Sequence, residues 1–449
     1  MTRIDNNTLR AGWARLLFAA LATVALFFTA NAHAAVAGET GTSFALTATD
    51  GQISVSDGGS IYMWGYSAPN GSTMQLPGPT LIVPEGQLIT VTLNNDLPNA
   101  AGNTSIVFPG HEVSFSGGVD GDLTQEAAPG GSVTYTFTAG QPGTYQYHSG
   151  SQPDLQVEMG LYGTLIVRPS MPVPAGMAGC AYNHVDSCYD REFLYVLSEI
   201  DLDIHEEAAQ QAGSEGQIVM PLGAYVSEYW LMNGRAAPDT MAPDNATALP
   251  TQPYGSLTTM HPGEKLLVRL VGAGREMHPF HTHGNHVRVL AHDGRMMLTE
   301  TTDSLAGPTL FTIPTLPGGT VDAIFEWTGK GLGWDMYGHS AGGVECIDDD
   351  NDGFDDPGDG QGTDWEWCAD HNKPIPVDLP AISSLGFGGF YSGSPYLGAL
   401  GALPPGEGGL NPNAGFAYMW HSHTERELLN NDIYPGGMLT MLIVEARGE

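Results

Sequence analysis

Two short histidine motifs stand out in the sequence, because their spacing can bring several imidazoles together. The first is the triplet His281-Thr-His283 and the second is the triplet His421-Ser-His423. In a β-strand, residues i and i+2 point to the same side, so each triplet presents a pair of imidazoles on one face. If the two strands are neighbours, four imidazoles surround one small volume. Imidazole is a good ligand for copper, zinc, iron and nickel, so we expect a metal site here rather than two polar edge strands.

Elements that could position these histidines are mostly strands. Runs of β-branched and aromatic residues alternate with Gly, Pro, Asn and Asp turns, a spacing typical of Greek-key β-sandwiches. The pattern predicts a single helix, at about Thr424–Asn431. The predicted strands are Thr80–Val83, Leu88–Leu93, Ser132–Thr138, Tyr162–Val167, Glu192–Leu197, Lys265–Val271, His286–Leu290, Val321–Trp327 and Leu439–Val444.

The chain divides into two strand-rich blocks, so we expect an all-β fold with two β-sandwich domains. The first domain is predicted at 42–170 and the second at 191–449, with a linker at 171–190. A segment rich in Gly, Pro and Asp, at about 340–415, interrupts the second domain. Loops of that length are uncommon inside compact domains, which indicates that the insert is functional or is ordered by ligands.

The composition excludes some classes of function. The chain has 449 residues, with 15 Lys and Arg against 50 Asp and Glu, and a formal net charge of -35. A strongly acidic chain repels phosphate backbones, so we expect no nucleic-acid partner. A hydrophobic fraction of 41% is typical of globular proteins, so the charge does not indicate disorder.

The first 34 residues have the features of a secretory signal peptide. Three arginines precede an apolar run from Leu16 to Ala30, and Ala32-His-Ala34 supplies a small-residue cleavage pattern. An uncleaved membrane anchor is the alternative. We therefore expect an exported protein, periplasmic or extracellular, with no membrane span after removal of the signal.

Four cysteines fit an exported protein, because disulfides persist in oxidising compartments. Four cysteines allow three pairings. The pairing of neighbours, Cys180 with Cys188 and Cys346 with Cys368, closes two short loops without crossing between domains.

Several separated motifs resemble those of multicopper oxidases. The resemblance implies two cupredoxin-like Greek-key domains, as in two-domain laccases and copper nitrite reductases. It covers most of the chain outside the signal peptide and the insert. The motifs are His278-Pro-Phe-His281-Thr-His283-Gly, Trp420-His-Ser-His423, Gly436-Gly-Met438, Trp230-Leu-Met-Asn233-Gly-Arg235, Leu76-Pro-Gly-Pro79-Thr80, Tyr147-His148-Ser149 and Gly160-Leu-Tyr-Gly163.

The resemblance also implies a set of copper ligands. Family members hold three coppers with eight histidines, and five of the eight have a match here: His148, His281, His283, His421 and His423. Where the family has its first His-Trp-His-Gly, this chain has Val107-Phe-Pro-Gly110, and nearby His111 is a further candidate ligand. Five further histidines are expected at the surface rather than at a metal; they are His184, His205, His261, His292 and His371. His339 is left open.

The type 1 copper ligands of the family are incomplete. Ser422 stands where the family has its cysteine, and a neutral hydroxyl does not replace a thiolate as a redox ligand. His278 matches one type 1 histidine and Met438 matches the axial methionine, whereas Glu427 or a neighbour stands where the second histidine is expected. The segment His111-Glu-Val-Ser-Phe115 can also be aligned with copper nitrite reductases. In that alignment Ser149 stands at the position of the type 1 cysteine. We therefore expect no type 1 centre.

These features favour an exported copper-binding protein that resembles multicopper oxidases. A site of histidines alone, between domains, could hold copper or zinc and give an oxidoreductase with altered activity toward a small molecule or a metal ion. The resemblance also implies a homotrimer, since two-domain relatives complete copper sites between subunits. The alternative is a non-catalytic metal-binding or structural protein on the same scaffold.

The insert contains a candidate calcium site. Its acidic residues Asp348, Asp350, Asp352, Asp356 and Asp359 have the alternate spacing with which a loop wraps calcium. The flanks are rich in Gly and Pro, so a free-standing loop is expected rather than an EF-hand. The alternative is an acidic loop that is simply solvated.

Overall fold

The computed structural model describes residues 36–68, 71, 73–220, 223–327, 347–349, 351, 355–356, 368, 394–395 and 416–444. The predicted signal peptide and most of the predicted insert lie outside these ranges. Within them strands predominate, which confirms the mainly β fold predicted from the sequence.

The strands between Glu39 and Arg168 form two sheets. One sheet has the order β1-β5-β10-β9, with β1 Glu39–Thr40, β5 Leu81–Pro84, β10 Tyr162–Arg168 and β9 Gly143–His148. The other has the order β4-β3-β2-β6-β8-β7, with β4 Met74–Gln75, β3 Ser60–Ser67, β2 Ser43–Ser54, β6 Leu88–Asn95, β8 Ser132–Thr138 and β7 Ser114–Gly117. Strand β6 alternates buried and partly exposed residues, as expected of a strand with one face on a core. Strand β10 is buried at six consecutive positions, because both of its faces are covered.

The strands from Arg191 onward form two further large sheets. One has the order β14-β13-β16-β22-β18-β19, with β20 also paired to β18. Its bounds are β14 Tyr229–Met232, β13 Arg191–Ile200, β16 Lys265–Gly272, β22 Thr320–Glu326, β18 Val287–His292, β19 Arg295–Met296 and β20 Thr309–Leu310. The other has the order β15-β25-β24-β17-β21, with β23 also paired to β24. Its bounds are β15 Thr258–Met260, β25 Leu439–Val444, β24 Phe416–Ser422, β17 His278–Thr282, β21 Thr312–Thr315 and β23 Ser394–Pro395.

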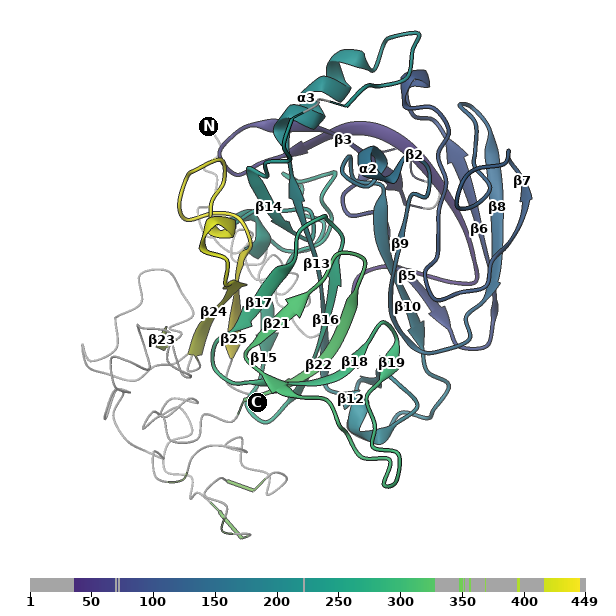
Figure 1. Cartoon of the computed structure of the whole chain (residues 1–449). Coiled ribbons are helices and arrows are strands. Elements are labelled where there is room, and N and C mark those ends of the chain that lie inside the picture. Colours follow the sequence, from purple (N-terminus) through teal and green to yellow (C-terminus); the bar gives the residue numbers. More distant parts are fainter. Residues whose placement is uncertain are drawn as a thin grey trace, which may run out of the picture. The chain divides into compact units, whose positions relative to one another are not determined.

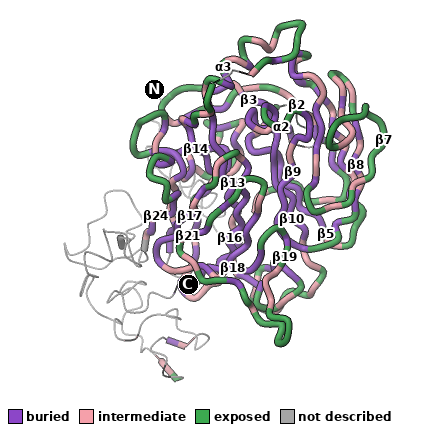
Figure 2. Tube along the Cα trace, viewed as in Figure 1, coloured by how far each residue is buried: buried purple, intermediate pink, exposed green. Residues whose placement is uncertain are grey.

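Each pair of sheets encloses an apolar core, so the structure contains a first and a second β-sandwich (Figure 1). Trp64, Tyr135 and Tyr147 lie in the first core, and Trp420 and Trp327 lie in the second. A third cluster combines residues of both sandwiches, including buried side chains of β3 and β13. Figure 2 shows the buried positions following the strands, while the connecting loops are largely exposed.

Helices are few and short among the described residues. They are α2 Pro153–Gln156 and α3 Leu202–Gln211, with 3-10 turns η2 Asn99–Ala101, η3 Val185–Ser187, η4 Asp239–Met241 and η7 Glu425–Leu428. The helix predicted at Thr424–Asn431 is therefore only the 3-10 turn η7. Helix α3 was not predicted from the sequence; the Asp201 carboxylate caps it by accepting a hydrogen bond from the Asp203 backbone. None of the described helices is long and apolar enough to cross a membrane.

One of the two predicted disulfides lies in the described part of the chain. Cys180 and Cys188 are bonded, and they join the short antiparallel strands β11 Gly179–Cys180 and β12 Cys188–Tyr189. The pairing of these two cysteines is thereby confirmed. The second predicted pair includes Cys346, which lies outside the described residues.

Candidate metal centre

The two histidine motifs lie on neighbouring antiparallel strands. Strand β17 pairs with β24 in a register that sets His281 directly opposite His421. His283 directly follows the end of β17, and the backbone N–H of His423 donates to the Pro279 carbonyl, 2.9 Å away. The pairing of these strands therefore gathers all four motif histidines, as the sequence predicted for neighbouring strands.

Three of these imidazoles form a compact, buried group. Ring nitrogens of His281, His283 and His421 lie within 4.8 Å of one another. The Nε2 atoms of His283 and His421 are 3.3 Å apart. Each of the three residues is less than a tenth exposed. Three nitrogens converging on one point is the donor arrangement of mononuclear copper and zinc sites.

Hydrogen bonds at the other ring nitrogen orient two of these rings. His281 Nδ1 lies 2.7 Å from the Thr312 hydroxyl, which β21 places opposite it in the sheet. His421 Nδ1 lies 2.6 Å from the Ser422 carbonyl oxygen, which can only accept, so this nitrogen carries the proton. The Nε2 lone pair of His421 is left to bind a metal, as in histidine ligands held by a neighbouring carbonyl.

Two of the imidazoles, those of His281 and His421, are held in the neutral form that binds metals. Burial, followed by the proximity of the other imidazoles, lowers the pKa of His281 to about 3. Burial also lowers the pKa of His421, to about 4, and the nearby His283 and His423 add to the effect. A site of neutral nitrogen donors needs no proton to leave before a metal binds at neutral pH.

His423 lies at the rim of this group. Its ring centroid is 4.7 Å from that of His281 and 5.7 Å from that of His421. Its side chain is 51% exposed, and its Nδ1 is 3.5 Å from the exposed Glu425 carboxylate. The position suits a fourth ligand that joins from the solvent side.

The candidate ligands of the first β-sandwich are not part of this group within the chain. His148 ends β9, and its Nδ1 lies 2.9 Å from the Ser149 carbonyl oxygen. His111 packs against the rings of Phe137 and Tyr145, with centroids 4.8 Å and 4.7 Å away. Burial lowers the pKa of both histidines. Among the described residues, neither belongs to the histidine group of β17 and β24.

His278 and Glu427, two of the residues matched to the type 1 site, form an ion-pair network with Glu199. His278 Nε2 lies 2.9 Å from the Glu199 carboxylate, and His278 Nδ1 lies 3.0 Å from the Glu427 carboxylate. All three side chains are at most 4% exposed. Burial alone would lower the pKa of His278, but hydrogen bonds and charge from the two carboxylates raise it to about 9. His278 is therefore an imidazolium with both nitrogens occupied. We call these three residues the Glu–His–Glu triad.

The two other residues matched to the type 1 site lie beside the triad and contribute backbone hydrogen bonds. The backbone of Met438 accepts from Ser422 and donates to the Glu427 carbonyl. The Ser422 hydroxyl accepts from the Thr424 backbone at 3.2 Å. A hydroxyl and a doubly hydrogen-bonded imidazolium do not fit the thiolate and neutral imidazoles that a type 1 copper requires.

The role of Glu199 and the burial of His205 were not predicted from the sequence. Glu199 lies in β13, two residues beyond the end of the strand predicted there, and an acid in a largely apolar strand was the available signal. His205 was expected at the surface but is 1% exposed, with Nδ1 2.7 Å from the Tyr62 carbonyl oxygen. It lies on α3, the unpredicted helix, and packing of α3 against the first β-sandwich buries it.

Comparison with known proteins decides the broad class. Residues 49–172 match the family model described as multicopper oxidase. The chain is a multicopper-oxidase-like protein. This match falls on the first β-sandwich, which lacks several of the expected histidines, and not on the second, which carries the histidine group.

Two curated relatives illustrate how partial the sequence similarity is. Multicopper oxidase VdtB of Byssochlamys spectabilis is 36% identical over 118 residues, which is 24% of this chain and 16% of VdtB. A probable nitrite reductase-hydroxylamine oxidoreductase fusion protein of Kuenenia stuttgartiensis is 26% identical over 232 residues, 49% of this chain and 22% of that protein. The matches thus span less than a quarter of either relative.

Similarity of structure extends over most of the multicopper-oxidase-like chain. The crystal structure of a blue copper oxidase from Nitrosomonas europaea aligns with a TM-score of 0.51 at 18% sequence identity, covering 90% of this chain and 86% of that one. At this identity the likeness shows the fold, which is cupredoxin-like. The fold predicted from the motifs is confirmed.

The candidate calcium residues are only partly described. Asp350, Asp352 and Asp359 lie outside the described residues. Asp356 accepts a hydrogen bond from the Asp349 backbone at 2.7 Å, so it contributes to the loop's own turn. Neither the described residues of this loop nor the comparisons support calcium here.

Proposed function

We propose that this protein is an exported copper-binding relative of multicopper oxidases, with a copper site made of histidines alone and no type 1 centre. The convergence of His281, His283 and His421 carries the proposal, because ring nitrogens of all three lie within 4.8 Å of one another. Their burial shields the site, and the hydrogen bonds at His281 and His421 keep the rings in place. The family match of the first β-sandwich favours copper over zinc.

The residues present fit a copper ion held by three imidazoles, with His423 available as a fourth. Bound copper would supply one-electron redox chemistry and a coordination position for a small molecule. The chain itself would orient the rings through Thr312 and the Ser422 carbonyl, and would exclude bulk water through burial. A small molecule or a metal ion would serve as the substrate of an oxidoreductase built on this site.

Exposed apolar side chains on both β-sandwiches suggest how a homotrimer would complete the site. Phe311 is 51% exposed and its ring lies 5.6 Å from that of His281. Leu123 is 62% exposed and lies close to Gly150, near His148. Exposed apolar side chains near both groups of candidate ligands favour contact between copies of the chain. In such an assembly, His148 from a neighbouring copy would join the histidines of β17 and β24.

Copper binding by the metal-free protein tests the site. We expect tight binding of copper by calorimetry and an electron paramagnetic resonance spectrum of nitrogen-coordinated copper, with no strong band near 600 nm. His421→Ala should lower the copper affinity at least about 100-fold, since even loss of a hydrogen bond to a ligand costs 10- to 100-fold. His292→Ala, which alters an exposed histidine, is the matched control. Equal copper binding by both variants would exclude this site.

The Glu–His–Glu triad favours the second candidate function, a non-catalytic metal-binding protein. Without a thiolate between His421 and His423, electrons from a distant substrate have no short route to the copper. Oxygen uptake by copper-loaded protein with a phenolic or metal-ion reductant separates the two functions. Turnover that is lost in His421→Ala supports the oxidoreductase, and its absence in fully loaded protein supports the binding protein.

A further inference from the structure

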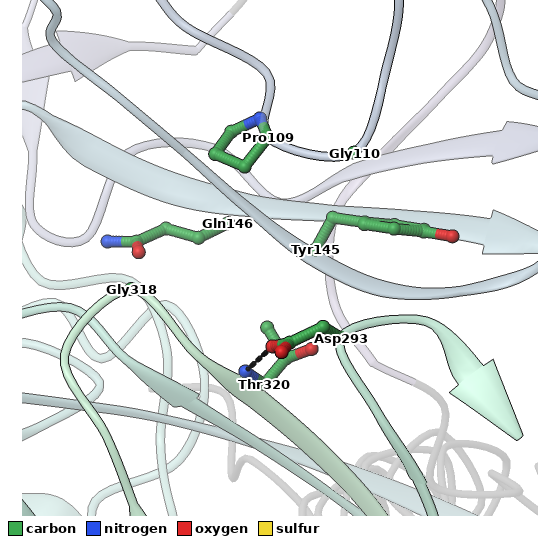
Figure 3. A pocket seen from close by; sticks show the side chains of 7 residues that line it. All are labelled: Pro109, Gly110, Tyr145, Gln146, Asp293, Gly318 and Thr320. Carbon is green, nitrogen blue, oxygen red and sulfur yellow. Dashed lines mark hydrogen bonds between the residues drawn. The ribbon is translucent and has the colours of Figure 1, made fainter. Parts of the chain in front are cut away.

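The buried histidine group needs a path by which a metal ion reaches it. His281, His283 and His421 are each less than a tenth exposed, so a hydrated ion in solution does not meet them directly. A pocket of about 290 Å³ opens between Tyr145 and the turn that carries Asp293, but none of its lining residues belongs to the histidine group (Figure 3). The exposed rim of the group is the place where an ion can arrive.

His423 forms this rim and reaches solvent. Its side chain is 51% exposed. Its ring centroid nevertheless lies only 4.7 Å from that of His281 and 5.7 Å from that of His421. An ion bound by His423 is therefore one ligand exchange away from the buried imidazoles.

The carboxylate of Glu425 lies beside His423 on the solvent side. One of its oxygens is 3.5 Å from Nδ1 of His423, and its side chain is 83% exposed. An imidazole nitrogen and a carboxylate oxygen at this separation can share a divalent ion, and both are accepted ligands of zinc and copper. The negative charge of Glu425 also attracts cations from solution.

Backbone hydrogen bonds hold this pair of residues in place. The N–H of His423 donates to the Pro279 carbonyl at 2.9 Å, which ties the chain after β24 to β17. Glu425 begins the 3-10 turn η7. The N–H of Thr424, between the two residues, donates to the Ser422 hydroxyl at 3.2 Å. The two side chains can therefore exchange partners while the backbone keeps its position.

We infer that His423 and Glu425 form an entry site, which takes up a copper ion from solution and passes it to the buried histidine group. The inference rests on the proposed copper site and adds the order in which its ligands are met. The transfer is a ligand exchange: the bond to the Glu425 oxygen breaks as bonds to the buried ring nitrogens form, and no electron is transferred. Glu425 acts during entry only, because the finished site consists of imidazoles.

Stopped-flow mixing of the metal-free protein with Cu²⁺ tests the entry site. Trp420 supplies the signal, because its indole N–H donates to the His283 carbonyl at 3.0 Å and copper at the group quenches its fluorescence. We expect Glu425→Gln to slow association at least about threefold at about 10 mM salt, and the difference should shrink at about 1 M salt, where exposed charges are screened. Glu206→Gln, which removes an exposed acid on α3, is the matched control and should leave association unchanged.

The equilibrium affinity separates the entry site from the finished site. Calorimetry should give Glu425→Gln the copper affinity of the unaltered protein within about twofold, since an exposed charge contributes little to a formed complex. Release of copper into excess chelator should be no faster. Association of Glu425→Gln as fast as that of Glu206→Gln would overturn the entry site and leave the copper site standing.

Two other outcomes would also overturn the inference. Weaker affinity of Glu425→Gln together with faster release would make Glu425 a ligand of the finished site. Equal copper affinity of His421→Ala and the unaltered protein would refute the proposed copper site itself, and the entry site with it.

Discussion

Replacing His278 by glutamine should destabilise the protein strongly, and the loss should depend on pH. The imidazolium lies between the Glu199 and Glu427 carboxylates, with both distances near 3 Å and all three side chains buried. Removing the cation leaves two buried carboxylates without a balancing charge, although the backbone N–H groups of Arg275 and Glu276 still donate to Glu199. Loss of one member of a buried ion pair costs about 3–5 kcal/mol, so we expect a decrease of this size in the free energy of unfolding at neutral or lower pH.

The pH dependence follows from the pKa of His278, which folding raises from 6.5 to about 9. A raised pKa means that the folded state holds the proton more tightly than the unfolded state. The resulting stabilisation is complete below pH 6.5 and is lost as the pH rises through about 9. At about 1.4 kcal/mol per pKa unit, the contribution is about 3 kcal/mol.

Guanidinium unfolding, followed by tryptophan fluorescence, measures this effect. The deficit of His278→Gln relative to the unaltered protein should be about 3–5 kcal/mol near about pH 6 and should shrink by about 3 kcal/mol near about pH 9.5. His292→Gln, at an exposed position, should show almost no deficit at either pH. A deficit of His278→Gln that is the same at both pH values would refute the charged triad.

Three further predictions concern the rest of the described structure. Copper-loaded Ser422→Cys should show no band near 600 nm in its visible absorption spectrum. Ser422→Cys combined with Glu427→His should show one, because the thiolate then has a neutral histidine beside it. Cys180→Ser opens a loop closed across 8 residues and should lower stability by about 2.5 kcal/mol on a chain-entropy basis, measured by guanidinium unfolding with a reduced control. Despite its burial, Glu192 has a pKa of about 2, because Arg269 and Arg168 stabilise its charge. Its contribution to folding stability is therefore present above pH 4.5 and is lost as the pH falls toward 2. The melting temperature of Glu192→Gln should be far less sensitive to acid in that range.

Much of the fold could be predicted because strands and turns have local signals. The predicted strand Ser132–Thr138 has the same bounds in the structure, and the predicted strand at Leu439 ends at Val444 in both. Helix α3 was missed because only Ile204, His205 and Ala208 face the protein, a short apolar stripe that a sequence pattern does not separate from a loop. The capping Asp201 was the one local signal for it.

The candidate site could be predicted in part for a similar reason. Histidines at alternate positions share a face whatever the tertiary structure, so each pair was visible in the sequence. That the pairs meet depends on the register of β17 with β24, which only the folded sheet fixes. The partner of His278 could not be predicted in the same way, because Glu199 comes from β13, in the other sheet of the second β-sandwich.

The Glu–His–Glu triad explains how the interior around His278 stays closed without a metal. A cavity shaped for a metal would leave His278 buried with unpaired polar atoms, which is costly. Glu199 and Glu427 satisfy both ring nitrogens and balance the charge, so the interior stays closed without a metal. The backbone of Ser422 remains paired to Met438, so the strand that carries His421 keeps its position. Substitutions around His278 can therefore leave the histidine group undisturbed, although β24 contributes residues to both.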